Sequence, residues 1–290
     1  MIPTLFELGP FKLHSYGLCL ALGLIFGHWL LTLELRRKKQ PEAFAGTVIL
    51  LAAVFGIIGS RLFDILEHPE AFSANPLKTL FSGAGLTWYG GFLMATAAIW
   101  IAARIKKIPW WSLIDSCTPG LAIGYGFGRL GCFLSGDGCY GTPCNAGLPF
   151  PLCMSFPNGI VPTTEVVYNT PLWEIGGAIL TFAFIWWART RVSRPPLLFL
   201  QWIVIHAVLR LLVEFVRRNP ELAFGLSQAQ VISLGLIVVG VVGLLVLRGR
   251  PPVPAATAGT ATTAAAGATT ARDGTAAARG PKGKGKGKRR

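Results

Sequence analysis

Charged residues are scarce in this 290-residue sequence and make up only 14% of it. Apolar residues account for 52%, and the mean hydropathy is +0.54. Soluble domains carry about a quarter charged residues, so a water-soluble globular body is excluded. The composition is typical of a polytopic membrane protein that is embedded in the bilayer.

Further absences narrow the class of protein. The six cysteines include no Cys-Xaa2-Cys pair, and their irregular spacing argues against a zinc site. The glycine-rich run from Gly128 to Gly141 lacks the Lys-Ser/Thr ending of a phosphate loop and follows an apolar run rather than a strand. An anion transporter would be expected to show an inverted repeat and broken helices, and neither is visible. We therefore expect no metal, no cofactor and no nucleotide loop.

Windows of about 20 apolar residues, the length that crosses a bilayer, predict seven transmembrane helices. They lie near 15–35, 43–66, 88–106, 112–134, 171–188, 197–216 and 228–247. The first run is of spanning length and ends in a basic cluster, so we predict an anchor and not a cleaved signal peptide. The predicted fold class is an all-α integral membrane protein.

Basic residues predict the orientation of these helices. Lys and Arg cluster after the first, third and fifth spans and throughout the tail beyond Arg248. By the positive-inside rule these segments are cytoplasmic, which places the N-terminus outside and the C-terminus in the cytoplasm. The net charge of +14 then reflects orientation and tail, and no nucleic-acid partner is expected.

The composition changes abruptly near residue 250. Residues 1–250 are predicted to form one seven-helix domain with an outer loop at about 135–170 that caps the site. Residues 251–290 are rich in Ala, Thr, Gly and Lys and are predicted to be a disordered, basic cytoplasmic tail. In the outer loop, Cys139, Cys144 and Cys153 face an oxidising compartment, where we expect a disulfide among the three with its pairing left open.

Three arginines, Arg61, Arg129 and Arg210, interrupt three different apolar spans. A cation within a spanning helix is costly and usually faces the bundle interior, where it marks a pathway, a counter-ion or an anionic substrate. All three fall in the outer half of the predicted membrane, at a depth shared by His14 and Tyr16. Guanidinium groups bind phosphate bidentately. Since the abundant phosphate in a bilayer is a lipid headgroup, we predict a phosphate-binding layer.

Each of these residues has a structural alternative. Arg61 is equally well explained by an ion pair with Asp64, three residues later. Glu214 lies one turn beyond Arg210 and His206 one turn before it, on the same helix face. For His206 a polar contact with another helix is expected more than a role in the site.

Glycines single out the fourth predicted span as the central helix. Gly120, Gly124 and Gly128 recur every four residues and allow neighbouring helices to approach closely. The glycine-rich run after this span is too polar for lipid-exposed irregular backbone, so it is expected to line a cavity.

Over roughly residues 5–248 the sequence resembles the prolipoprotein diacylglyceryl transferases of bacterial plasma membranes. The resemblance rests on the order and spacing of several short motifs. They are His14-Ser15-Tyr16-Gly17-Leu18, Gly59-Ser60-Arg61-Leu62, Gly85-Leu86-Thr87-Trp88-Tyr89-Gly90-Gly91, Asp115 ahead of Gly128-Arg129, and Leu209-Arg210 through Glu214-Phe215-Val216-Arg217.

The resemblance implies a multi-pass enzyme of the bacterial inner membrane that catalyses the first step of lipoprotein maturation. Such an enzyme moves the diacylglyceryl group of phosphatidylglycerol to the lipobox cysteine thiol in the signal peptide of a preprolipoprotein. A thioether forms, and glycerol phosphate is released. The predicted catalytic residues are Tyr89, Arg129, Arg210 and Glu214. The predicted lipid- or phosphate-binding residues are His14, Tyr16, Arg61, Gly90, Gly128, Arg129, Asp137 and Arg210.

Three positions depart from the family pattern. Tyr89 stands where the family usually has His, a candidate base for the acceptor thiol, and neutral Tyr is a poor base at pH 7 because its pKa is about 10. Cys132 stands where Asn is common, and Asp137 where Glu is frequent. Either Tyr89 is perturbed enough to act, or it positions the thiol for another base. The alternative is a non-catalytic or altered-specificity relative that binds or moves lipid and keeps the phosphate site.

Overall fold

The computed structural model describes residues 1–248 except 9–10, 75, 77–87, 146, 193 and 224. The chain divides into two units, Met1–Arg250 and Pro251–Arg290. The predicted disordered tail at 251–290 lies outside the described residues. All of the described helices and strands belong to the first unit.

Each of the seven predicted spans coincides with a helix. These are α1 (Ser15–Arg37), α2 (Phe44–Glu67), α5 (Trp88–Ile105), α6 (Trp110–Ser135), α7 (Thr170–Ala188), α8 (Leu197–Glu214) and α9 (Gln228–Arg248). A short helix, α3 (Pro69–Ala74), follows α2. By length and hydropathy, five helices, α1, α2, α7, α8 and α9, are long and apolar enough to cross a membrane. The chain is therefore a multi-pass membrane protein.

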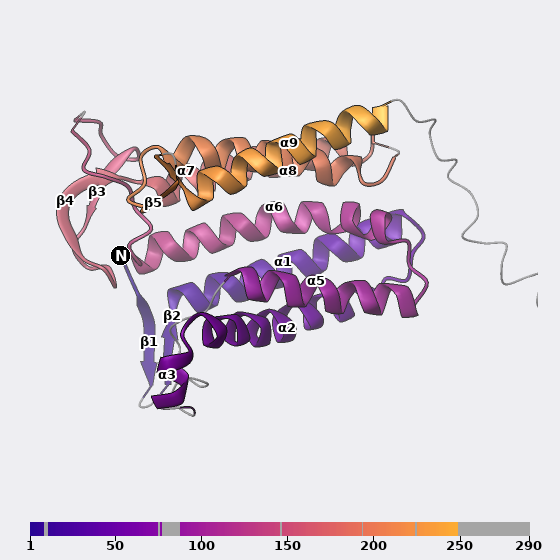
Figure 1. Ribbon diagram of the computed structural model, residues 1–290, viewed down its shortest axis with the longest axis horizontal. Coiled ribbons are helices and arrows are strands. Elements are labelled where there is room, and N and C mark those ends of the chain that lie inside the picture. The colour runs from indigo at the N-terminus through magenta and orange to yellow at the C-terminus, as the bar shows by residue number, and fades with distance from the viewer. Residues whose placement is uncertain are drawn as a thin grey trace, which may run out of the picture. The chain divides into compact units, whose positions relative to one another are not determined.

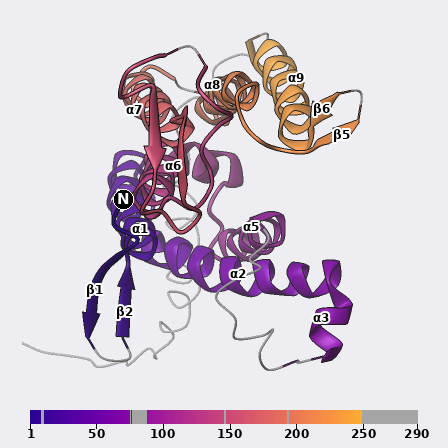
Figure 2. The same ribbon diagram turned by 90° about the vertical axis from the view of Figure 1, so that its left-hand side faces the viewer.

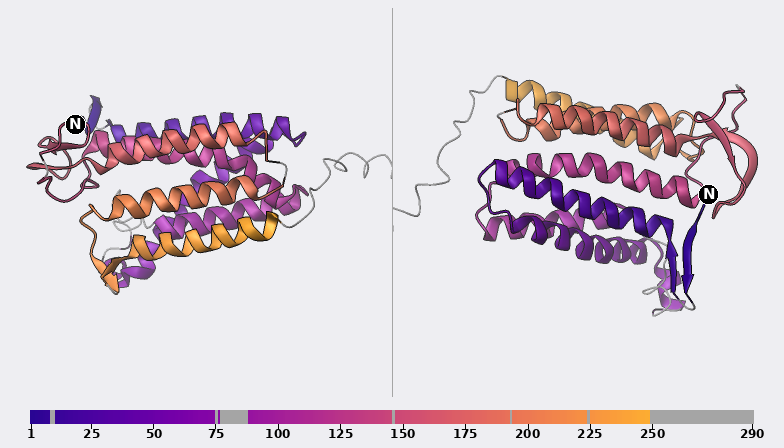
Figure 3. Two further views of the ribbon diagram at one scale, coloured as in Figure 1. Left: turned by 90° about the horizontal axis from the view of Figure 1, so that it is seen from above. Right: turned by 180° about the vertical axis from the view of Figure 1, so that it is seen from behind.

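The long helices run side by side, with α6 in the middle (Figures 1 and 3). On one side α6 packs against α1, and on the other it packs against α7 and α8. The α2–α5 pair packs beside α1, and α9 packs against α8. The prediction that the fourth span is the central helix is thus confirmed.

Glycines allow two of these helix pairs to meet backbone to backbone. A methyl group on Gly120 of α6 would lie 3.3 Å from the Cα of Gly27 on α1, and one on Gly23 would lie 3.7 Å from the Cα of Gly124. The predicted close approach is confirmed at these two positions. It is wrong for Gly128, where a methyl group would meet nothing within 4 Å.

Three two-stranded antiparallel sheets lie at one end of the described bundle, here called the hairpin end (Figure 2). They pair β1 (Thr4–Leu8) with β2 (Phe11–His14), β3 (Cys153–Phe156) with β4 (Thr163–Tyr168), and β5 (Glu221–Ala223) with β6 (Leu226–Ser227). The all-α prediction holds for the bundle and missed these hairpins, because they are short and lie in polar connections.

The β3–β4 hairpin gives the predicted outer loop a small core of its own. Phe156 and Val167 are fully buried, and Tyr140 stacks on Phe156 with ring centroids 5.0 Å apart. Cys144 and Cys153 form a disulfide, which confirms one bridge among the three expected cysteines. Cys139 is a free thiol.

Buried polar contacts hold the opposite end together. Glu34 on α1 receives ion pairs from Arg37 and from Arg189 after α7, each at 2.6 Å. Asp115 on α6 accepts the backbone N–H of Phe199 at 3.0 Å. Phe199 lies in the first turn of α8, where N–H groups have no partner within their own helix. Asp115 therefore caps α8 and fixes it against α6.

Candidate functional site

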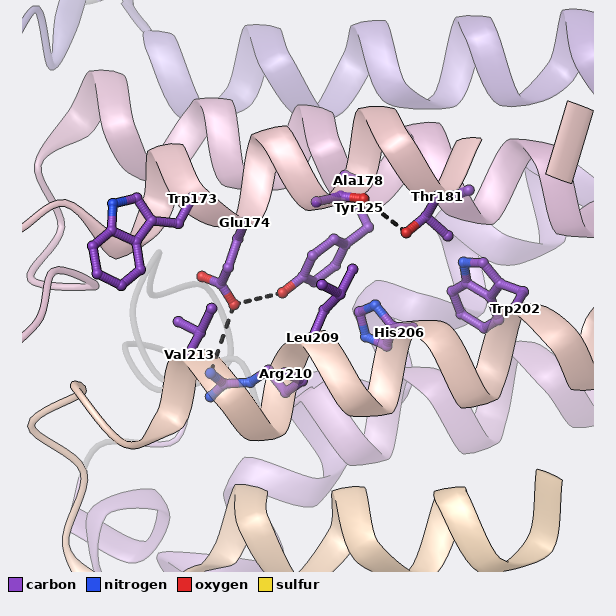
Figure 4. Close-up of a pocket in the computed structure, with 12 residues that line it drawn as sticks. Tyr125, Trp173, Glu174, Ala178, Thr181, Trp202, His206, Leu209, Arg210 and Val213 are labelled. Atoms are coloured by element: carbon purple, nitrogen blue, oxygen red, sulfur yellow. Dashed lines mark hydrogen bonds and ion pairs between the residues drawn. The ribbon is translucent and has the colours of Figure 1, made fainter. Parts of the chain in front are cut away.

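Two of the three predicted arginines meet at one buried carboxylate. Arg129 Nε on α6 lies 3.2 Å from Glu174 Oε2 on α7, and Arg210 Nη1 on α8 lies 3.6 Å from Glu174 Oε1. The side chain of Glu174 is only 3% exposed. Three helices, α6, α7 and α8, thus bring charged groups together near the hairpin end. Figure 4 shows the contact between Glu174 and Arg210.

Glu214 supports Arg210 from the same helix. Its Oε2 atom lies 2.7 Å from Arg210 Nη2. Its Oε1 atom accepts hydrogen bonds from Ser227 Oγ, at 2.7 Å, and from the side-chain amide of Asn219. These contacts place the expected orienting carboxylate beside Arg210. They also tie β6 to the end of α8.

A third arginine completes the group. Arg217 Nη1 lies 3.4 Å from Glu174 Oε2, and Arg217 Nε lies 4.0 Å from Glu214 Oε2. We call Arg129, Arg210 and Arg217 the arginine cluster. Three guanidinium groups face two carboxylates, Glu174 and Glu214, so the formal charge is +3 − 2 = +1. In a poorly hydrated interior this excess favours an anion strongly.

Aromatic rings form one side of the site. Tyr125 donates its hydroxyl hydrogen to Glu174 Oε1 at 2.6 Å, and the Arg129 guanidinium lies 5.0 Å from the centre of the Tyr125 ring. His206 lies edge-on to Tyr125, with centroids 4.4 Å apart, and stacks on Trp202. His206 is therefore packed between rings of α6 and α8. It meets another helix as expected, through a ring contact, and the expected polar contact stays a prediction.

A cavity of about 30 Å³ lies between α6, α7 and α8 beside these groups (Figure 4). It is lined by Ala122, Tyr125, Trp173, Glu174, Gly177, Ala178, Thr181, Trp202, His206, Leu209, Arg210 and Val213. Such a volume holds about one or two waters and no lipid headgroup. Among the described residues, two buried donors here have no hydrogen-bond acceptor, Arg210 Nη1 and Trp173 Nε1. Buried donors without partners are rare in proteins, so they point to a ligand with acceptor oxygens.

Tyr16 lies in the first turn of α1, and its ring lies against Gly131 of α6, two residues after Arg129. Asp137 Oδ1 accepts the backbone N–H of Cys139 at 3.1 Å, just beyond the end of α6. The binding roles predicted for Tyr16 and Asp137 stay predictions.

Other predicted residues lie elsewhere. Arg61 pairs with Asp64 at 3.4 Å on α2, which packs against α5 and α1. Arg61 therefore lies apart from Arg129 and Arg210, which meet at Glu174. His14 is exposed and immediately precedes α1. Gly90 lies where α5 crosses α2 in direct backbone contact with Gly59, which explains a glycine there by packing. Its predicted binding role stays a prediction.

Two more of the predicted site residues are Tyr89 and Gly128. Tyr89 lies in the first turn of α5, and its side chain is outside the described residues. Gly128 is partly buried one residue before Arg129, and its Cβ position has open space around it. The roles assigned to both stay predictions.

The sequence reasoning missed Glu174, Arg217 and Tyr125. Glu174 carries a readable signal, because an acid within an apolar span is as costly as a buried arginine and usually has a cationic partner. Arg217 was named as the last residue of a family motif and was given no role in the site. Tyr125 has no distinctive sequence signal, since a tyrosine in an apolar helix is ordinary.

Comparison with known proteins gives a consistent result. The family model described as prolipoprotein diacylglyceryl transferase matches residues 3–246. A phosphatidylglycerol–prolipoprotein diacylglyceryl transferase of Leptospira interrogans is 30% identical over 276 residues, covering 78% of this chain and 86% of the relative. The enzyme of the same name from Dehalococcoides mccartyi is 33% identical over 243 residues, covering 82% and 91%. That from Clostridium tetani is 30% identical over 246 residues, covering 83% and 96%.

Proposed function

The chain belongs to the prolipoprotein diacylglyceryl transferase family, and from this premise we propose that it transfers the diacylglyceryl group of phosphatidylglycerol to a prolipoprotein cysteine. The acceptor is the lipobox cysteine of a signal peptide, and the step is the first in lipoprotein maturation. The observation that carries the proposal is the arginine cluster, which keeps a formal charge of +1 after pairing with Glu174 and Glu214.

The reaction breaks one C–O bond and forms one C–S bond. The cysteine thiol loses its proton, and the thiolate attacks the glyceryl carbon that carries the phosphate. The electron pair of the broken bond stays on the leaving oxygen, and glycerol phosphate departs with one more negative charge than the bound phosphodiester. Arg129 and Arg210 stabilise that growing charge, since preorganised cations act most strongly where charge develops.

Glu174 holds the site in its lipid-free arrangement. In this arrangement its two oxygens occupy Arg129, Arg210 and Arg217, and the cavity beside them holds only water-sized molecules. We propose that the phosphate takes over contacts of Glu174 as α7 separates from α8. Arg210 Nη1, released from its 3.6 Å ion pair with Glu174, and Trp173 Nε1, which has no hydrogen-bond acceptor among the described residues, then bind phosphate oxygens.

The protein is proposed to lie in the bacterial inner membrane with all seven long helices spanning it. The hairpin end then faces outward and the basic tail faces the cytoplasm, as the distribution of Lys and Arg indicates. Both substrates reach the arginine cluster from the outer half of the bilayer, where phosphatidylglycerol headgroups and the lipobox cysteine are available.

A reconstitution assay tests the proposal. Purified protein receives phosphatidylglycerol vesicles and a peptide containing a lipobox cysteine, and mass spectrometry detects the thioether-linked lipopeptide. We expect product from the native chain and none from Arg129→Ala. Arg36→Ala serves as the matched control, because Arg36 is exposed at the other end of α1. Lipid binding without any product in the native chain contradicts the enzyme and supports the lipid-binding alternative.

A further inference from the structure

Two free cysteines meet beside the arginine cluster. Cys132 lies in the last turn of α6 and is only 8% exposed, whereas Cys139 follows the helix and is half-buried. The Cys132 thiol is close enough to Cys139 to act on the pKa of the Cys139 thiol. Their sulfur atoms and a carboxylate oxygen of Asp137 all lie within 4.8 Å of one another.

The backbone turn after α6 brings the two thiols together. Gly136 ends the helix in the left-handed conformation with φ +59°, and Gly138 has φ +87°. Side chains with a Cβ atom rarely adopt such angles, so glycine makes the reversal possible. The hydrogen bond from Cys139 N–H to Asp137 Oδ1 closes the turn. The chain therefore returns to the end of α6, and Cys139 reaches Cys132.

The surrounding charges favour a thiolate over a metal ion. Two thiols and one carboxylate are a donor set that a soft cation accepts. However, Arg129 lies one turn before Cys132 on α6, and the guanidinium groups of Arg129 and Arg217 both act on Cys139. Two fixed cations disfavour a third and stabilise negative sulfur.

We propose that Cys132 and Cys139 are a redox-active pair, oxidised to a disulfide by a disulfide-bearing oxidant, and that this bond inhibits the proposed transferase. The formation of this disulfide does not depend on the proposed function, whereas the inhibition rests on it. The same segment already carries the Cys144–Cys153 disulfide. An oxidising partner thus reaches this part of the chain.

The reaction is a balanced thiol–disulfide exchange. Cys139 is the more exposed of the two, and as a thiolate it attacks one sulfur of the oxidant and releases the first thiol. Cys132 then gives its proton to solvent and attacks the mixed disulfide, which forms the Cys132–Cys139 bond and releases the second thiol. The two cysteines together lose two electrons, and the oxidant gains them.

The Cys132 thiol assists the first step. It lowers the pKa of the Cys139 thiol below its ordinary value. Burial and the negative charge of Asp137 oppose this effect, the positive charges of Arg217 and Arg129 support it, and the pKa of Cys139 remains lowered. More thiolate is then present at neutral pH, and the thiolate is the attacking species.

The disulfide would connect the parts of the site that must separate. The carbonyl of Cys139 accepts a hydrogen bond from Thr170 Oγ1 at 2.7 Å, one turn before Glu174 on α7. Three residues further on, Thr142 N–H donates to the carbonyl of Val216 at 2.8 Å, immediately before Arg217. Cys132 is fixed to α6, which carries Arg129. A bond between Cys132 and Cys139 therefore keeps α6 close to α7 and to the segment that carries Arg217. It opposes the separation of the helices that a phosphate needs.

Thiol counting tests the pair without any activity measurement. Purified protein is incubated with oxidised and reduced glutathione at several ratios, denatured, and alkylated with N-ethylmaleimide. Four cysteines are free, Cys19, Cys117, Cys132 and Cys139. Oxidation of the pair removes two adducts, so 4 − 2 = 2 remain, and peptide mapping locates the new bond. Cys117→Ser, the matched control, must still lose two adducts, whereas Cys132→Ser and Cys139→Ser must not form the bond.

The activity arm is separate. We expect the oxidised form to lipidate peptide at least about tenfold more slowly, with recovery after reduction and no redox response in Cys132→Ser. The redox-active pair is contradicted if four N-ethylmaleimide adducts remain at every glutathione ratio. It is also contradicted if the purified protein holds stoichiometric zinc that is lost in Cys139→Ser. A bond that forms without slowing lipidation overturns the inhibition. If no redox state yields lipopeptide while the adduct count still falls to two, the transferase proposal fails and the pair stands.

Discussion

Arg129 on α6 and Glu174 on α7 form a 3.2 Å ion pair near the hairpin end of the bundle. The same carboxylate also accepts the Tyr125 hydroxyl and faces Arg210 and Arg217. Glu174 is therefore the group through which α6, α7 and the end of α8 are held in register. A buried carboxylate with this many partners both positions the cations and competes with an anionic ligand for them.

Glu174→Gln should destabilise the protein. The change keeps the shape of the side chain, removes the ion pair of Arg129, and leaves Arg210 and Arg217 facing Glu214. Loss of one partner from a buried ion pair costs about 3 kcal/mol or more. Thermal unfolding in detergent checks this, with Glu165→Gln as the control, since Glu165 is exposed and pairs with exposed Arg218. Equal melting temperatures for the two variants would contradict the central role of Glu174.

Arg210→Lys should retain charge and lose most activity. The Arg210 fork faces Glu174 with one nitrogen and Glu214 with the other. A single ammonium group cannot hold both carboxylates and also bind phosphate bidentately. We expect kcat/KM to fall by about 100-fold. The lipidation assay measures this, and Arg36→Lys should remain within about twofold of the native chain.

Arg217→Ala and Arg218→Ala should have very different effects on the affinity for phosphatidylglycerol, although the two residues are adjacent. The Arg217 side chain is 10% exposed and faces Glu174, whereas Arg218 is 43% exposed and pairs with Glu165. Loss of Arg217 removes the excess positive charge of the site, so we expect phosphatidylglycerol affinity to fall at least about tenfold. Surface ion pairs contribute little, so Arg218→Ala should change affinity by less than about twofold. Binding to vesicles of varied phosphatidylglycerol content gives both values.

Substitutions at Tyr89 test its proposed part in proton removal from the acceptor thiol. We expect Tyr89→Phe, which removes only the hydroxyl, to lower turnover about tenfold or more, and Tyr89→His, which restores the usual family residue, to keep it. Turnover is measured from pH 6 to pH 9, because a histidine base would act at lower pH than a tyrosine. Unchanged turnover in Tyr89→Phe would remove the hydroxyl from the mechanism.

The pH dependence of alkylation tests the environment of Cys139. Its folded-state pKa is lowered by the Cys132 thiol, so its thiolate persists at pH values below the ordinary thiol pKa of about 8.5. Cys132→Ala removes this thiol and should raise the pKa of Cys139, which slows alkylation of Cys139 at pH 7 and has little effect above pH 9. Peptide mapping after timed iodoacetamide treatment measures the rate. Cys117→Ala should leave the profile of Cys139 in place, and a profile unmoved by Cys132→Ala would contradict the effect of the Cys132 thiol.

The local parts of the site were predictable. Hydropathy and length are properties of short windows, so the seven helices and the buried positions of Arg129 and Arg210 could be read from the sequence. Glu214 was found because an i, i+4 spacing places it beside Arg210 on one helix. The strands at the hairpin end were missed, since they are short and carry a weak alternating pattern.

By itself, then, the sequence determined the membrane class, the family and which side chains are too polar for lipid, because each of these depends on composition, order and spacing. Only the tertiary structure decided how those side chains pair. Glu174 meets Arg129 because α6 and α7 pack together, and Arg217 meets Glu174 and Glu214 because the chain after α8 turns back over the site. The Arg61–Asp64 pair is the exception, since the two residues lie three apart on α2 and their spacing alone indicates the pair. Contacts between distant segments follow from helix packing, which no single window of sequence contains.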